Sequence, residues 1–196
     1  MSTETADIVV IGGGSGGYAA AIRAAELGKS AVIVEKDKVG GTCLHRGCIP
    51  TKALLHAAEV ADTARGASAI GVLTTVDRID GDLIQAYRDG IVAKKFKGLE
   101  GLLKARGIRT VTGTARLEAD GTVRVGDTVW NATDVIIATG ASSRVLPGIE
   151  VGGRILTSDQ ALERAEIPRH ALVLGGGVIG VEFASLWRSL GAEVTI

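Results

Sequence analysis

The chain has 196 residues, enough for one or two domains, and its 46% hydrophobic and 22% charged residues are ordinary for a soluble α/β protein. The 22 basic and 22 acidic residues balance, which argues against a general affinity for nucleic acid or for an anionic membrane. The N-terminus lacks the basic and apolar regions of a signal peptide, and no apolar stretch reaches the roughly 18 residues of a transmembrane helix. We therefore expect a cytoplasmic protein that binds neither nucleic acid nor membrane.

The first elements in chain order are a strand, a glycine turn, a helix and a second strand. An apolar run at 8–11 enters the turn, an alanine-rich helix extends to Leu27, and a strand ends at Glu35. Gly12, Gly14 and Gly17 have the G-x-G-x-x-G spacing that lets backbone approach a pyrophosphate at a helix N-terminus. Glu35 is placed to accept hydrogen bonds from ribose hydroxyls. This context predicts a dinucleotide site; a glycine turn that serves only helix packing is the alternative.

The only two cysteines, Cys43 and Cys48, follow this first unit. In the cytosol such a close pair is more often redox-active or metal-binding than structural. Residues five apart in a regular helix have Cα atoms about 8–9 Å apart, whereas a disulfide requires less than about 7 Å. A bridge would need distorted backbone, which Gly47 allows. Zinc is disfavoured because only His45 and His56 lie nearby, so we expect no metal; two inert thiols are the other alternative.

The middle of the chain changes from helices to strands. The apolar patterns predict helices over 51–65 and 81–106, followed by strands over 108–139 with a hairpin turn at Asp120-Gly121. A buried strand that begins at Asp134 runs into a loop at Thr139-Gly140. The stretch around 147–153 contains proline and paired glycines and is the expected linker.

The opening pattern then returns at an offset of 163 residues. This offset places Gly175 where Gly12 stands and Gly180 where Gly17 stands, before a helix to Leu190 and a strand over 193–196. A second dinucleotide-binding unit therefore begins here. The position equivalent to Glu35 lies beyond the last residue, so we expect a fragment that stops inside this second unit.

Two charged residues near these features are candidates for function. Lys52 follows the cysteines, and Glu182 lies in the first turn of the second nucleotide helix, near where a nicotinamide would bind. The alternative for each is a solvated surface charge, the usual state of such residues.

Several segments together resemble one family. Gly-Gly-Thr-Cys-Leu-His-Arg-Gly-Cys-Ile-Pro-Thr-Lys at 40–52 resembles the redox-active disulfide motif of the flavin-dependent pyridine nucleotide–disulfide oxidoreductases. Ala138-Thr139-Gly140 is similar to the family's second flavin motif, and 175–187 is similar to its nicotinamide-binding turn. Trp187 is more similar to the lipoamide branch than to the glutathione branch.

The resemblance implies an α/β fold in two parts. Residues 1–150 would form a Rossmann-like FAD-binding domain with a small β-meander and the redox-active disulfide. Residues 151–196 would form the truncated start of a Rossmann-like NAD(P)-binding domain. The implied reaction is oxidation of dihydrolipoamide by NAD⁺ through the Cys43–Cys48 disulfide and FAD. The alternatives are an NADPH-dependent reductase of mercuric or glutathione type, and an inactive flavin-binding fragment.

The resemblance also implies partners and residue roles. Dihydrolipoamide, free or on the lipoyl domain of a 2-oxoacid dehydrogenase complex, would be the partner of a full-length homodimer whose general base, a histidine, lies outside this chain. Cys43 would be the exchange thiol, Cys48 the flavin-side thiol, and Lys52 the ion-pair partner of Glu182. The cofactor-binding residues would be Gly12, Gly14, Gly17, Glu35, Lys36, Gly41, Thr42, Lys52, Ala115, Thr139, Gly140, Gly175, Gly177, Gly180 and Glu182.

Overall fold

The computed structural model describes residues 2–196, which separate into two compact units by packing. One unit contains residues 2–45 and 93–142, and the other contains residues 46–92 and 143–196. This grouping reflects packing alone, so the division at 150 into an FAD-binding and an NAD(P)-binding domain stays a prediction. No helix within residues 2–196 is long and apolar enough to cross a membrane.

The first unit is built on a six-stranded sheet with the order β3-β2-β1-β6-β5-β4. Its strands are β1 (Ser2–Ile11), β2 (Ala31–Glu35), β3 (Arg109–Thr112), β4 (Ala115–Leu117), β5 (Val123–Val125) and β6 (Thr128–Ile137). The pairs β3-β2, β2-β1 and β1-β6 are parallel, and β6-β5 and β5-β4 are antiparallel. The parallel part with the helix between β1 and β2 is the Rossmann-like arrangement, and β4–β6 form the meander, as the sequence predicts.

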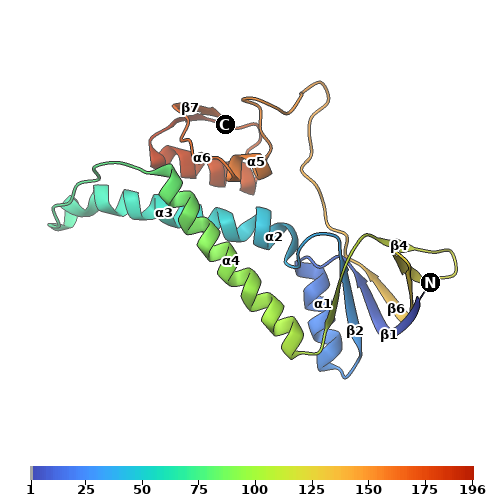
Figure 1. Cartoon of the computed structure of the whole chain (residues 1–196). Helices are drawn as coiled ribbons and strands as arrows, with labels where there is room; N and C mark the ends of the chain where they lie inside the picture. Colours follow the sequence, from blue (N-terminus) through green and yellow to red (C-terminus); the bar gives the residue numbers. More distant parts are fainter. Residues whose placement is uncertain (1) are drawn as a thin grey trace. The chain divides into compact units, whose positions relative to one another are not determined.

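Alternating side chains of β1 and β2 fill two layers of core, one on each face of the sheet. Val10 and Ile33 pack against Ala21 and Ala24 of α1 (Ser15–Glu26), which lies against the sheet in Figure 1. On the other face, Val9, Val32 and Val34 pack against three residues of the meander, which are Val123, Val125 and Trp130. The sheet therefore holds the loops after β1, β2 and β6 at one edge, since these three strands run parallel.

The second unit is largely helical. It contains α3 (Cys48–Gly66), the 3₁₀ helix η1 (Ala67–Ile70), the first part of α4 (Gly81–Ala105), α5 (Ser158–Leu162), β7 (His170–Leu172), α6 (Val178–Leu190) and β8 (Glu193–Thr195). Its core joins Leu54 and Ala58 of α3 to Leu162 of α5 and to Phe183 and Leu186 of α6. The strands β7 and β8 pair in parallel, as expected for the start of a second nucleotide fold.

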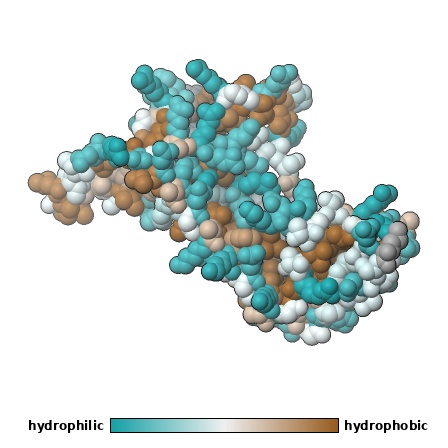
Figure 2. Space-filling model, viewed as in Figure 1, coloured by the Kyte–Doolittle hydropathy of each residue, from teal (hydrophilic) through white to brown (hydrophobic). Residues whose placement is uncertain are grey.

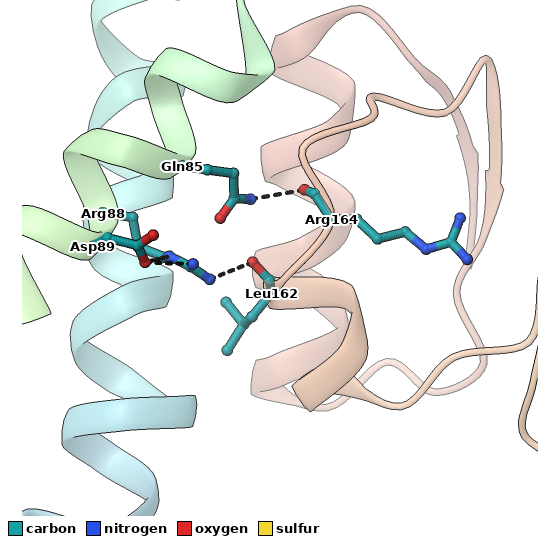
Figure 3. A network of polar contacts seen from close by, with 5 residues as sticks. All are labelled: Gln85, Arg88, Asp89, Leu162 and Arg164. Carbon is teal, nitrogen blue, oxygen red and sulfur yellow. Dashed lines mark hydrogen bonds and ion pairs between the residues drawn. The ribbon is translucent and has the colours of Figure 1, made fainter.

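Polar contacts fasten α5 to α4 within this unit (Figure 3). Arg88 donates from Nη1 to the Leu162 carbonyl oxygen at 2.7 Å, and Gln85 donates from Nε2 to the Arg164 carbonyl oxygen at 2.7 Å. Gly81, the first residue of α4, has no room for a side chain, because a Cβ there would lie 1.9 Å from the Ala165 carbonyl oxygen. The segment after α5 therefore lies directly on the beginning of α4.

The structure differs from the sequence prediction in several element boundaries. The helix expected over 51–65 begins earlier, at Cys48, and β1 is longer than the apolar run at 8–11. The second nucleotide unit begins with β7 at His170, whose partner in the parallel pair is Glu193. The helix α5 was not predicted, although Thr157 and Gln160 form a capping box at its start.

Candidate functional site

In the first glycine turn, backbone segments approach one another so closely that a side chain would not fit. A Cβ on Gly12, whose φ is +104°, would lie 2.1 Å from the Ala138 carbonyl oxygen, and a Cβ on Gly17 would lie 1.9 Å from the Gly12 carbonyl oxygen. Gly12 also lies beside Thr139, whose Cα would be 3.2 Å from that Cβ. The structure thus brings the ends of β1 and β6 together, although they are far apart in sequence.

The N-terminus of α1 is open toward this turn. Its N-cap is Gly14, no side chain caps the helix, and no acidic residue lies in the first turn. A Cβ on Gly16 would meet nothing within 4 Å, and Gly41, with φ +57°, approaches Gly14 so closely that its Cβ would lie 2.6 Å from the Gly14 Cα. Uncapped N–H groups and glycines with no side chains in the way fit the pyrophosphate of a dinucleotide.

Glu35 is fixed at the end of β2 beside the same turn. Its Oε2 accepts a hydrogen bond from the Gly13 N–H at 2.7 Å, and its Oε1 accepts one from the Asp37 N–H at 3.0 Å. Each carboxylate oxygen can accept a further hydrogen bond, so a bound ribose could still be recognised. The sequence located this carboxylate, but not the backbone donors that orient it.

The cysteine segment is formed by two consecutive helices rather than one. The short helix α2 (Gly41–Arg46) contains Cys43, and α3 begins at Cys48. Gly47 between them has φ −148° and ψ −115°, which is not helical. This break agrees with the expectation that Gly47 permits distorted backbone. Cys43 is half-buried and Cys48 is exposed at the first position of α3, where no side chain caps the helix.

The short helix α2 is anchored through its own His45. His45 Nε2 lies 2.9 Å from the Val39 carbonyl oxygen, and its ring packs edge-on against Phe96 of α4 with 5.2 Å between ring centroids. Leu44, the next residue after Cys43, is buried. These contacts hold Cys43 in place. The contact between His45 and Phe96 could not be predicted, because the two residues lie about fifty positions apart and no local sequence pattern links them.

Lys52 and Glu182 form an ion pair within the second unit, and a hydrogen bond joins Lys52 Nζ to Glu182 Oε1. The lysine comes from the second turn of α3. Because α6 begins at Val178, the glutamate lies in its second turn and not, as the sequence predicts, in the first turn. The lysine side chain is 60% exposed and that of the glutamate 24% exposed. The pair therefore remains accessible to a ligand, and exposed pairs of this kind add little stability.

The second glycine turn repeats the geometry of the first. Gly175 has φ +114°, and a Cβ on Gly180 would lie 2.1 Å from the Gly175 carbonyl oxygen. The corresponding distance in the first turn, from a Cβ on Gly17 to the Gly12 carbonyl oxygen, is 1.9 Å. Gly177 is the N-cap of α6, again without a side-chain cap. The offset of 163 residues therefore relates two structures as well as two sequences.

For four predicted cofactor-binding residues, the structure gives a position but no contact that bears on cofactor binding. Lys36 is exposed after β2, Thr42 is exposed in α2, and Ala115 begins β4 and packs against the meander core. Gly140 has φ +81° in the loop after β6. Their roles stay predictions.

A family model described as pyridine nucleotide-disulphide oxidoreductase matches residues 6–196. The chain belongs to this family. The dihydrolipoyl dehydrogenase of Bacillus subtilis (strain 168) is 45% identical over 210 residues, a match that covers 100% of this chain and 44% of the relative. Dihydrolipoyl dehydrogenase 2 of Haloarcula marismortui is 43% identical, with 99% of this chain and 43% of the relative covered.

Solved structures of a flavoprotein disulfide reductase have the same fold. The HOCl-induced flavoprotein disulfide reductase RclA from Escherichia coli superposes with a TM-score of 0.78 at 29% identity, covering 97% of this chain and 41% of the reductase. Its Cu(II) complex gives a TM-score of 0.79. The chain thus spans less than half the length of the oxidoreductases it matches.

Proposed function

We propose that this oxidoreductase chain is the FAD-binding part of a dihydrolipoamide dehydrogenase, which oxidises dihydrolipoamide with NAD⁺. The observation that carries the proposal is the cysteine pair at the junction of α2 and α3, where Gly47 interrupts the helix. The identity of 40–45% to proteins named dihydrolipoyl dehydrogenase supports the choice of substrate. We further propose that the full-length protein is a cytoplasmic homodimer, as the family resemblance implies.

The two glycine turns support the proposal that the protein binds FAD and NAD. FAD would be held by the turn from Gly12 to Gly17, by Glu35 and by the Thr139-Gly140 loop, and NAD by the turn from Gly175 to Gly180. When bound, FAD would accept two electrons from the thiols and deliver them as hydride to NAD⁺. The space for the FAD pyrophosphate is supported by the uncapped α1 and by the glycines around it.

The cysteines would exchange electrons with the substrate by thiol–disulfide exchange. A thiolate of dihydrolipoamide attacks Sγ of Cys43 in the oxidised pair, which breaks the Cys43–Cys48 bond and releases Cys48 as a thiolate. The second substrate thiolate attacks the substrate sulfur of that mixed disulfide and releases Cys43. Two electrons move to the cysteines, and the two substrate thiols lose their protons to a base outside this chain.

Single serine variants of the full-length, FAD-loaded protein test this assignment. Cys43→Ser and Cys48→Ser should each reduce lipoamide turnover at least about 1,000-fold, because no disulfide can form. After reduction, the long-wavelength absorbance of a thiolate beside FAD should be lost in Cys48→Ser and kept in Cys43→Ser. Equal absorbance in the two variants would overturn the assignment of Cys48 to the flavin side.

Substrate assays separate the proposed enzyme from its alternatives. Full-length protein that oxidises NADPH with glutathione disulfide, and is inert to lipoamide with NADH, would contradict the lipoamide assignment. The 196-residue chain by itself should show little lipoamide turnover, because the resemblance places the general base elsewhere. Robust turnover by that chain would show that the base lies within it.

A further inference from the structure

Thr51, the fourth residue of α3, is polar in a chain that otherwise buries apolar side chains, glycine and proline. It is the only polar residue buried within the described residues 2–196, and 6% of its surface is exposed. Polar side chains lie mostly at the surface, and Figure 2 shows hydrophilic ones gathered over α4. Burying a hydroxyl group costs free energy unless the group is hydrogen-bonded. The Thr51 hydroxyl therefore needs a partner inside the protein.

That partner is the carbonyl group of Gly47. Thr51 Oγ1 donates to the Gly47 carbonyl oxygen at 2.7 Å, and the Thr51 N–H donates to the same oxygen at 3.0 Å. A carbonyl oxygen has two lone pairs, so one residue supplies a donor for each. Gly47 is the non-helical residue between α2 and α3, and Cys48 follows it directly. Thr51 therefore holds the peptide group that joins this break to Cys48.

The stability of α3 does not explain the hydroxyl. The Thr51 N–H alone supplies the ordinary helical hydrogen bond to the Gly47 carbonyl oxygen. Valine is similar in shape to threonine and would fill the same space without burying a polar atom. What the hydroxyl adds is a second donor on the same carbonyl group, a bond that threonine can make to the residue four positions earlier. A carbonyl group held by two donors rotates less freely than one held by a single donor.

We propose that Thr51 is a positioning residue for the redox-active cysteines, and that it acts by fixing the peptide group before Cys48. This inference rests on the proposed function, in which Cys48 forms a disulfide with Cys43. A disulfide has specific geometry and is stable only when both side chains are held in suitable positions. If the Gly47–Cys48 peptide rotates, fewer arrangements of Cys48 suit the bond, and the dithiol is favoured. Because Thr51 is buried, it acts through Gly47 and not directly on substrate.

The experiment measures the equilibrium between disulfide and dithiol in the full-length, FAD-loaded protein. Buffers of reduced and oxidised dithiothreitol supply or accept the two electrons and two protons. After acid quenching and alkylation, mass spectrometry of the peptide that contains Cys43 and Cys48 gives the ratio of the two forms. Thr51→Val should lower the ratio of disulfide to dithiol about 3- to 10-fold, the effect of one hydrogen bond on an equilibrium.

Three further variants separate the hydroxyl from the size of the side chain. Thr51→Ser keeps the hydroxyl and should keep a ratio near that of the wild type. Thr51→Ala lacks it and should fall at least as far as Thr51→Val, so the result does not depend on how well valine fits. The matched control is Thr63→Val, which removes a hydroxyl from an exposed position of α3 and should leave the ratio unchanged. The midpoint of thermal unfolding is measured for each variant in parallel.

The possible outcomes distinguish this inference from a structural role and from the proposed function. A wild-type ratio in Thr51→Val would overturn the inference even if the unfolding midpoint falls, because a purely structural role gives that result. An equal fall in Thr51→Ser or in Thr63→Val would also overturn it. Wild-type protein in which Cys43 and Cys48 never form a disulfide would instead contradict the proposed function, and this inference with it.

Discussion

Single glycines in the first turn differ sharply in what they tolerate, although they are neighbours in sequence. Gly16 and Gly17 are both in the first turn of α1, but a Cβ on Gly16 would meet nothing within 4 Å, while one on Gly17 would lie 1.9 Å from the Gly12 carbonyl oxygen. The third glycine of the G-x-G-x-x-G spacing is therefore required by contact between helix and turn, independently of any cofactor.

This contrast gives a prediction that needs no bound cofactor. Gly17→Ala should destabilise the protein by about 2 kcal/mol or more, because backbone must move to admit the methyl group. Gly16→Ala should be neutral or stabilising by up to about 1 kcal/mol, because alanine has the higher helix propensity. Urea unfolding of the flavin-free variants measures both values. Equal free energies of unfolding would contradict the contact at Gly17.

At the scale of the element, α5 depends on α4 more than on its own five residues. Arg88, whose side chain is only 13% exposed, donates to the carbonyl oxygen of Leu162, the last residue of α5. Leu162 is itself 2% exposed. Removing the arginine would therefore leave a largely buried carbonyl oxygen without its partner, which is costly.

Arg88→Met should lower the free energy of local opening around α5 by about 1–3 kcal/mol. Hydrogen exchange of the amides in 156–164 measures that opening. The control is Arg78→Met, which removes an exposed arginine paired with Asp80 and should change protection by less than about 0.5 kcal/mol. Unchanged exchange in Arg88→Met would show that the apolar core alone fixes α5.

The sequence predicted those features of the fold that depend on residues close together in the chain. The tight turn at Gly12 and Gly17 and the place of Glu35 at a strand end could be predicted, because glycine spacing and strand ends are readable within thirty residues. The cofactor roles of these residues stay predictions. The helix α5 is too short for helical periodicity, so only its capping box could have indicated it. The contacts of His45 with Phe96 and of Arg88 with Leu162 depend on which elements pack together, which no local pattern contains.

At the scale of the whole molecule, packing does not follow chain order. Residues from 143 onward share their core with α3 and with the first part of α4, which lie before 93 in sequence. The exposed segment around Arg144 has neither helix nor strand, so it should tolerate an inserted site for a specific protease.

After cleavage at that inserted site, the two pieces should elute together in size-exclusion chromatography. The pieces should remain associated because Phe183 and Leu186 of the C-terminal piece pack with Leu54 of the other. Phe183→Ala/Leu186→Ala should separate them, since each truncation of a buried side chain costs about 2–5 kcal/mol. Pieces of the wild-type protein that elute separately would contradict a shared core.

The interleaving of the two units also sets the order of events during translation. The strand β1 leaves the ribosome more than a hundred residues before its partner β6. The helices α3 and α4 emerge in between, and α3 presents Leu54 and Ala58 before α6 has been synthesised to cover them. A nascent chain at this stage carries a bare apolar helix face, which is the kind of surface that chaperones bind.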